Sequence, residues 1–323
     1  MLNTCNVLKH PFIFMSNIIF QINGGIGKCI AATAVCAAIK NQYPDRDLIV
    51  VSGYPEVFLN NPNVKKALVF GGTSYFYQDY IENSDSITML HDPYLESDAM
   101  YQRRHLIEVW CKLCGVKYNG EMPQIFMTQR EISGFQSQVN VDKPIMLLQA
   151  NGGGDVNKKY SWARDLPTNV TAKIIDHFHS RYAIFHIKRD DQIGFSNTFP
   201  ITLPFRQIFA ISLLSKKRLL IDSFMQHACA AFNLPSVACW VVNTPKLFGY
   251  KIHTHIMANP FTATPELRNA YIGKFSIAGD EAEFPYNNED EIFDVNKIIN
   301  ALEADEVGAG LRGQSPTGKI VLP

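Results

Sequence analysis

The sequence predicts an α/β fold made of two similar halves, each built around a parallel sheet, with a ligand cleft between them. Short β-branched runs alternate with segments of helical periodicity, which is typical of βαβ units. The alternation restarts after residues 140–144 (NVDKP), whose composition is typical of a linker. In each half a glycine-rich turn directly follows the first strand. Two such halves would bind a ligand beyond the carboxyl ends of their strands.

In the first half we expect strands at residues 17–22, 47–51, 66–70 and 86–90. The helix after the first strand carries Ala32, Val35, Cys36 and Ile39 on its buried face, and another helix surrounds Trp110. A short helix is expected at residues 55–59. The predicted N-terminal domain is residues 1–140, of which 1–15 are a candidate extension outside the fold.

In the second half the same patterns predict strands at residues 145–150, 181–187, 218–221 and 236–242. Helices are expected at residues 169–180, 205–214, 225–232 and 291–302. The predicted C-terminal domain is residues 141–302, and residues 303–323 have the composition of a tail.

The composition excludes some classes of function. Thirty basic residues balance thirty acidic ones among 323, so no overall charge favours nucleic acid as a partner. No run is long and apolar enough to span a membrane, and the N-terminus lacks a signal-peptide pattern. Seven cysteines, most of them in apolar runs, favour a reducing compartment, and we expect a cytoplasmic protein. Cys111 and Cys114 have CxxC spacing, but they lie in an amphipathic helix without a second pair, which favours packing over a metal or redox site.

The stretch NGGIGK at residues 23–28 resembles a phosphate-binding loop. It fails the Walker A pattern twice, since Ile22 stands where a glycine is needed and Cys29 where Ser or Thr is needed. It also lacks the third glycine of the dinucleotide fingerprint, where Ile30 stands. The turn still places a helix N-terminus at the expected cleft, and a helix N-terminus attracts electronegative groups. Lys28 then either binds an anionic partner or is simply solvated.

Three strand ends in the second half carry candidate phosphate-binding groups. Asp222 and Ser223 precede a helix, where they either cap it or leave its N–H groups to a diphosphate, with Gln226 and His227 one turn further on. The turn at residues 151–154 allows close backbone approach to a ligand, and Lys158 or Lys159 would neutralise its charge, unless the turn is merely an exposed loop. Arg189 is suited to bind phosphate or carboxylate, although Asp190 and Asp191 beside it are also ordinary solvated turn residues.

Together these segments resemble the ADP-heptose:lipopolysaccharide heptosyltransferase family (glycosyltransferase family nine) over residues 17–300. The similarity includes NGGIGKCIAATAVCAAIKNQYPDRDLIVV, VFLNNPNVKKALVF, KKYSWARDLP and, most specifically, DSFMQHACAAFNLPSVACW. The resemblance implies the GT-B fold, in which two Rossmann-like domains face each other across a cleft. It also implies that Lys159, Ser223, Met225, Gln226 and His227 surround the diphosphate of a nucleotide-sugar donor.

Two residues depart from the family pattern. The family usually has an aspartate, implicated as the catalytic base, directly after the first glycine turn, where this chain has Lys28. It usually has glycine after Asp-Ser in the donor loop, where this chain has Phe224. Asp92, at the end of a first-half strand beside His91, is therefore the replacement candidate for the base, although Asp-Pro is also a common turn.

The expected function is an inverting, metal-independent glycosyltransferase that moves a sugar from a nucleotide-diphosphate sugar to the hydroxyl of a glycan or another acceptor. No resident cofactor is expected, because the nucleotide sugar is a co-substrate. Two alternatives stay open: an inactive nucleotide-sugar-binding module, and a transferase acting on modified bases in DNA. The candidate catalytic residues are Asp92 and Lys28; the donor-binding candidates are Asn151, Gly152, Gly153, Lys159, Arg189, Asp222, Ser223, Phe224, Met225, Gln226 and His227; the acceptor-side candidates are Asn23, Gly24, Gly25, Gly27 and His91.

Overall fold

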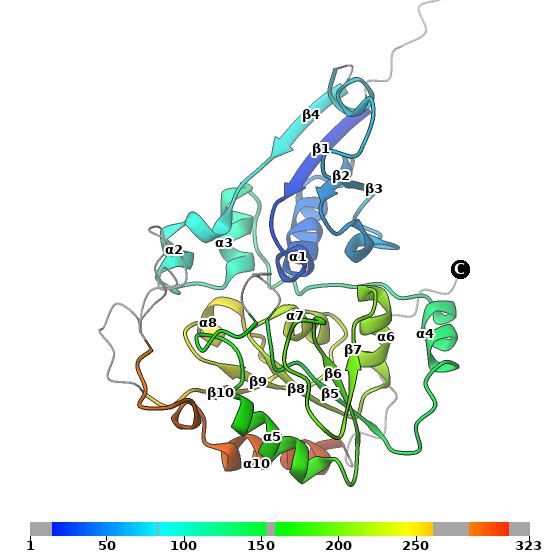
Figure 1. Ribbon diagram of the computed structural model, residues 1–323. Coiled ribbons are helices and arrows are strands. Elements are labelled where there is room, and N and C mark those ends of the chain that lie inside the picture. The colour runs from blue at the N-terminus through cyan, green and yellow to red at the C-terminus, as the bar shows by residue number, and fades with distance from the viewer. Residues whose placement is uncertain (1–14, 83, 153–158, 261–283, 310–323) are drawn as a thin grey trace, which may run out of the picture.

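The computed structural model describes residues 15–82, 84–152, 159–260 and 284–309. It contains two parallel sheets, one in each half of the chain, with helices on their faces (Figure 1). No helix or strand covers residues 140–144, the predicted linker, and the second sheet begins at Ile145. The predicted α/β class with two parallel sheets is confirmed.

The first sheet has the strand order β3-β2-β1-β4. Its strands are close to the predicted ones, and β1 begins at Met15, the last residue of the predicted extension. Residues 1–14 lie outside the described residues. The elements of this half are β1 (Met15–Ile22), α1 (Ile26–Gln42), β2 (Asp47–Ser52), a 3-10 turn (Pro55–Phe58), β3 (Lys66–Val69), a π-helical turn (Gln78–Glu82), β4 (Ser84–Met89), a 3-10 turn (Pro93–Leu95), α2 (Ser97–Met100), α3 (Leu106–Leu113) and α4 (Gln129–Gln136).

The second sheet has the order β10-β9-β8-β5-β6-β7, and all of its strands are parallel. This is the strand order of a Rossmann fold, in which the chain runs outward from the centre first on one side and then on the other. The elements of this half are β5 (Ile145–Leu148), α5 (Thr168–Phe178), β6 (Ala183–Ile187), β7 (Thr198–Ile201), α6 (Phe205–Leu214), β8 (Lys217–Ile221), α7 (Phe224–Ala231), β9 (Val237–Trp240), α8 (Pro245–Phe248), β10 (Thr254–Met257), a 3-10 turn (Glu289–Glu291) and α10 (Val295–Ala309).

Five of the described α-helices and strands have no counterpart in the sequence prediction: α2, α4, β7, α8 and β10. Four of them, all but α4, are only four residues long, too short for periodicity to show. The prediction for the last helix was wrong at both ends, because residues 291–294 precede α10 and the helix continues to Ala309. No helix in the described residues is both long and apolar enough to cross a bilayer.

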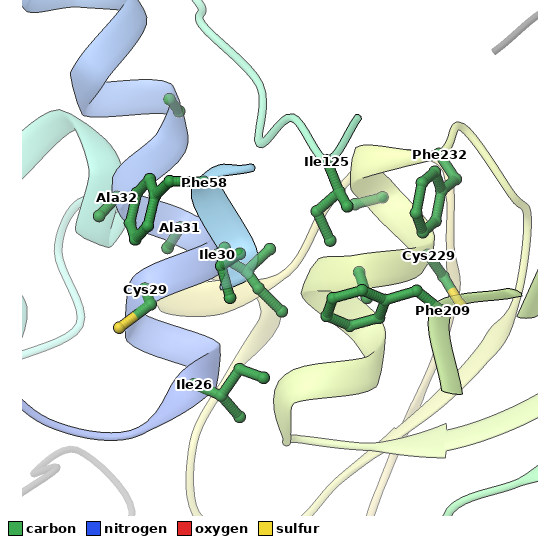
Figure 2. Close-up of a cluster of buried hydrophobic side chains, with 14 of the residues drawn as sticks. Ile26, Cys29, Ile30, Ala31, Ala32, Phe58, Ile125, Phe209, Cys229 and Phe232 are labelled. Atoms are coloured by element: carbon green, nitrogen blue, oxygen red, sulfur yellow. The ribbon is translucent and has the colours of Figure 1, made fainter. Parts of the chain in front are cut away.

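Helix α1 joins the two halves. It is rich in alanine and buried over most of its surface, as expected of a helix that is packed on all sides. Figure 2 shows Ile26 and Ile30 of α1, with Ile125, beside Phe209 of α6 and Phe232 after α7. One hydrophobic cluster therefore runs from the first sheet through α1 into the second half.

Candidate functional site

The candidate site lies where the carboxyl ends of both sheets meet. In the first sheet the chain runs from β1 to β2 and β3 on one side and then returns to β4, the edge strand on the other side of β1; in the second sheet it runs from β5 to β6 and β7 and then returns to β8 on the other side of β5. Such a switch point leaves a crevice at which ligands bind in open α/β sheets. A cleft of about 760 Å³ opens between the two halves, and this volume is within the range of small-molecule binding sites. Its lining includes Gly24, Gly25, Ile26, Gly27, Lys28, Tyr54 and Tyr94 from the first half, and Gln149, Asn151, Arg164, Lys188, Arg189, Asp190, Asp222, Ser223, Phe224, His227 and Asn243 from the second.

The first glycine turn forms one wall of this cleft. Gly24 has φ +114°, a conformation that residues with a side chain rarely adopt. A β-carbon at Gly27 would lie 3.3 Å from both His227 Cδ2 and Phe224 Cα, so the start of α1 almost touches the start of α7. Asn23 is exposed and, like His91, is not among the residues that line the cleft. Of the predicted acceptor-side residues, only the three glycines line it.

Lys28 lines the cleft, but it is not the solvated lysine that was one of the two alternatives from the sequence. Its side chain is 4% exposed and its Nζ lies 2.9 Å from Oδ1 of Asp92. The ammonium also lies 4.8 Å from the centre of the Tyr94 ring and 5.4 Å from that of Trp110. The negative faces of both rings favour a cation there. Lys28 is thus paired within the protein, and its charge is already balanced.

Asp92 is not among the residues that line the cleft, but it bonds two that are, Lys28 and Tyr94. Its side chain is 45% exposed, and Oδ1 accepts from both Lys28 Nζ and the backbone N–H of Tyr94. The second bond begins the turn predicted for Asp-Pro. Asp92 can therefore both form this turn and have a functional role, because Lys28 and Tyr94 both bond its Oδ1.

At the end of β5 a buried carboxylate organises the second wall. Asp165 accepts from the backbone N–H groups of Gly152 (2.8 Å) and Ser161 (3.0 Å) and from the side-chain amide of Asn151 (3.3 Å). Burial raises the pKa of Asp165, and these hydrogen bonds oppose that shift. Gly153, the third glycine predicted to bind the donor, lies outside the described residues.

Asp222 and Ser223 lie at the start of α7, as predicted, and both line the cleft. The Ser223 hydroxyl accepts from the side-chain amide of Gln149 (3.2 Å) and does not cap the helix. Asp222 is buried and accepts from the side-chain amide of Asn243. The N–H groups of the first turn of α7 are therefore not used by a side-chain cap.

Met225 and Gln226 were predicted to surround the diphosphate, but the structure places their side chains elsewhere. Both are completely buried and neither lines the cleft. The amide of Gln226 donates to the carbonyl of Phe248 (3.0 Å) and contacts His227 Nε2 (3.1 Å). A helix has one side toward the core, and these two residues occupy it in α7.

His227 lines the cleft but is held by the protein on both ring nitrogens. Nδ1 lies 2.7 Å from the Tyr250 hydroxyl, and Nε2 contacts Gln226. Burial, with His105 and His253 nearby, lowers the pKa of His227 to about 3. The ring is therefore neutral near pH 7, and it joins the two halves through its contact with Gly27.

The two predicted phosphate cations differ in their positions. Arg189 lines the cleft, but its Nε and one Nη bond both carboxylate oxygens of Asp191 at 2.9 and 3.1 Å. Hydrogen bonding from Arg189 lowers the pKa of the Asp191 carboxyl. Lys159 is exposed and is not among the lining residues.

The sequence analysis did not identify several residues that line the cleft, notably Arg164, Gln149, Asn243 and the aromatic residues Tyr54 and Phe205. The rings of Tyr54 and Phe205 are 5.7 Å apart across the two halves, and Phe224 continues the row at 5.3 Å. Gln149 and Asn243 follow buried strands, which is a signal that sequence can supply. Arg164 carries no such signal, because it follows neither a strand nor a glycine.

Cys111 and Cys114 are both buried, in agreement with the predicted packing role. Burial is the main cause that raises the pKa of each thiol to about 12, so both are protonated near neutral pH. Within the described ranges, no three His, Cys, Asp or Glu side chains are grouped so as to hold a metal ion.

Solved structures share this fold. The glycosyltransferase family nine protein of Veillonella parvula matches with a TM-score of 0.62 at 12% identity, over 92% of this chain and 98% of that one. ADP-heptose lps heptosyltransferase II of E. coli matches with a TM-score of 0.64 at 12% identity, over 90% of this chain and 99% of that one. The iron-containing dodecameric glycosyltransferase TibC of enterotoxigenic E. coli matches with a TM-score of 0.65 at 9% identity, over 92% of this chain and 78% of that one. No family model and no curated protein matches the sequence. At these identities the likeness shows the fold, and it confirms the GT-B architecture implied by the resemblance.

Proposed function

We propose that this protein is a glycosyltransferase that moves a sugar from a nucleoside-diphosphate sugar to an acceptor hydroxyl. The observation that carries the proposal is the cleft, because it joins the switch points of two Rossmann-like sheets and has different chemistry on its two walls. The start of α7 supplies N–H groups and partial positive charge for a diphosphate. On the side of the first half, Asp92, which bonds the lining residues Lys28 and Tyr94, supplies a carboxylate. Structural neighbours with this fold include a heptosyltransferase solved with ADP-D-beta-D-heptose, which makes ADP-sugars the first donors to test.

The proposed reaction is a single displacement. Asp92 accepts the proton of the acceptor hydroxyl as its oxygen attacks the anomeric carbon. The bond from that carbon to the diphosphate breaks on the opposite face, so the configuration inverts and the nucleoside diphosphate leaves with the bonding electron pair. Lys28, fixed on Tyr94 and Trp110, holds Oδ1 of Asp92, and Oδ2 is left to take the proton. Charge on the leaving group is stabilised by the α7 N-terminus, so the proposed step needs no metal ion.

The reaction is proposed to occur in the cytoplasm. The six cysteines of the described residues are free and buried, which supports a reducing compartment. The acceptor is proposed to be a glycan or another molecule with a free hydroxyl.

The first test screens ADP-, UDP-, GDP-, CMP- and dTDP-linked sugars for thermal stabilisation, since a ligand that binds only the folded state raises its melting temperature. We expect one nucleotide class to stabilise the protein and to be converted to the free nucleoside diphosphate, by transfer or slow hydrolysis, with EDTA present. Stabilisation without turnover would instead favour an inactive nucleotide-sugar-binding module. No stabilisation by any of them, together with DNA binding that weakens steeply with salt, would favour the DNA-modifying alternative.

Asp92→Asn tests the base. We expect the transfer rate to fall by about 10²- to 10⁴-fold, while binding of the nucleoside diphosphate changes less than twofold. Asp85→Asn is the matched control, because Asp85 lies on β4, the strand that precedes Asp92 in the chain, and its exposed carboxylate pairs with Arg46. Undiminished turnover in Asp92→Asn would exclude Asp92 as the base without affecting the proposed reaction class.

A further inference from the structure

The cations that line the cleft differ in how far the protein already neutralises them. Lys28 pairs with Asp92 at 2.9 Å, and Arg189 is bound twice by Asp191. Lys188, which also lines the cleft, donates only to the backbone carbonyl of Asp190 at 3.4 Å among the bonds of the described residues. Arg164 differs from Lys28 and Arg189, since its Nε lies 4.0 Å from Asp165 Oδ1. That carboxylate already accepts three hydrogen bonds from Gly152, Ser161 and Asn151, so it is occupied by other donors.

The position of Arg164 is built by the surrounding backbone. Its own N–H and that of Asp165 bond the carbonyl of Ser161 at 3.1 and 2.8 Å, which fixes a turn beneath it. Its guanidinium lies against Gly152, where a β-carbon would approach Nε to 2.3 Å and Cζ to 2.4 Å. Only glycine at position 152 leaves the guanidinium this place.

Arg164 also lies on the side of the cleft where α7 begins. Gly152 follows β5, and the side chain of Gln149 at the end of the same strand bonds the hydroxyl of Ser223 at the α7 N-terminus. The Arg164 side chain is 28% exposed and lines the cleft. An accessible guanidinium beside a helix N-terminus is suited to a diphosphate, since its N–H groups bind two oxygens at once.

We infer that Arg164 binds the diphosphate of the donor and of the leaving nucleoside diphosphate, and that Gly152 is required to leave space for it. This inference rests on the proposed function. It assigns to Arg164 the charge neutralisation that the sequence resemblance implied for Lys159. No covalent step passes through Arg164, which donates hydrogen bonds to the phosphate oxygens.

The test measures binding of ADP, UDP, GDP and inorganic pyrophosphate, with the matching nucleosides as phosphate-free probes, by titration calorimetry. Arg164→Ala is expected to raise the Kd of the preferred nucleoside diphosphate at least about tenfold and to leave nucleoside binding unchanged. Arg130→Ala is the matched control, since Arg130 is an exposed arginine on α4 that does not line the cleft. Arg130→Ala should change neither the Kd of the nucleoside diphosphate nor that of the nucleoside.

A double-mutant cycle tests the role of Gly152. Gly152→Ala should weaken diphosphate binding in the wild-type background, because it displaces the guanidinium, and should have little effect in the Arg164→Ala background. Additive effects would overturn the coupling of the two residues.

Two outcomes separate failure of the inference from failure of the proposed function. If the unmodified protein binds a nucleoside diphosphate and Arg164→Ala binds it within twofold, Arg164 is excluded and the proposed function stands. A tenfold loss in Lys159→Ala instead would return the role to Lys159. If the unmodified protein binds none of the diphosphates, both proposals are wrong.

Discussion

The two sheets repeat one plan but differ in how their outer faces are covered. The order β3-β2-β1-β4 of the first sheet is repeated as β7-β6-β5-β8 in the second, which then continues with β9 and β10. On the second sheet α5 and α10 pack on one face and α6 and α7 on the other (Figure 1). On the first sheet α1 covers one face, whereas the small cluster on the other includes only Ile19, Ile49, Val51 and Tyr80 as buried members.

This difference shows how the site is held together. The second sheet has a buried core on each of its faces. The first sheet has a large core only on the face of α1, and that core continues into the second half. Contacts between the halves should therefore contribute to the stability of the first half as well as to the geometry of the cleft.

The largest expected effect comes from breaking the joint between the halves at Arg206. This α6 side chain, 12% exposed, bonds both carboxylate oxygens of Glu131 on α4 and the carbonyls of Glu56 and Phe126. Burial alone would raise the pKa of Glu131, but bonds from Arg206 and Thr128 lower it to about 2. Arg206→Ala should lower the free energy of unfolding by about 3 kcal/mol, because it removes the cation of a partly buried ion pair and the donors of two backbone carbonyls, and leaves Glu131 bonded only to Thr128.

Chemical denaturation of Arg206→Ala measures this loss. The control is Arg104→Ala, whose partner Glu108 lies in an exposed pair, and its expected cost is much smaller because solvent screens such pairs. Equal costs for the two variants would show that the joint contributes no more than a surface ion pair.

The second prediction concerns acid, to which the second half should be more sensitive. Burial lowers the pKa of His186 and of His253 to about 4, and that of His227 to about 3. A depressed histidine pKa stabilises the fold above the unfolded value near 6.5, and this stability is lost as the pH falls toward the folded value. From pH 7 to 5 each such group costs about 2 kcal/mol.

His186→Leu tests this directly, because both ring nitrogens of His186 are buried and neither has a hydrogen-bond partner within the part of the chain that the structure describes. The variant should lose less stability between pH 7 and 5 than the wild type in melting experiments. His91→Leu, at an exposed position of the first half, should keep the wild-type pH dependence. If the wild type, His186→Leu and His91→Leu all lost the same stability between pH 7 and 5, the buried His186 would not be a source of the acid sensitivity.

The smallest predicted difference compares one buried tryptophan from each half. Trp240 donates its indole N–H to His255 Nδ1 at 3.0 Å, whereas the indole nitrogen of Trp110 has no hydrogen-bond partner among the described residues and its ring lies beneath Lys28. Trp→Phe removes similar volume at both sites, but only Trp240→Phe leaves a nitrogen unpaired. Trp240→Phe should therefore cost about 1 kcal/mol more in urea denaturation. A larger cost for Trp110→Phe would show that the ring under Lys28 contributes more than the hydrogen bond.

Local patterns were sufficient to predict most of the fold. The β-branched runs became strands within a few residues of their predicted bounds, and α6 was predicted to the residue. Helix α4 was missed although Thr128 and Glu131 have the spacing of a capping box, which the structure contains. Its few apolar residues gave no periodicity, so the cap was the only signal. In β7 the proline at position 200 hid a strand that lies at the sheet edge, where proline is tolerated.

The sequence by itself determined the two α/β halves, the position of the cleft at their strand ends and the glycine turns beside it, because these depend on residues close together in the chain. Only the tertiary structure decided which charges are available there. Lys28 meets Asp92 across 64 positions of sequence, and Arg189 is bound by its own neighbour Asp191. Met225 and Gln226 turn into the core, while Arg164 reaches the cleft because Gly152 leaves it room. The charge that a side chain offers to a ligand depends on which partners the fold brings within a few ångströms, and the sequence pattern does not contain those distances.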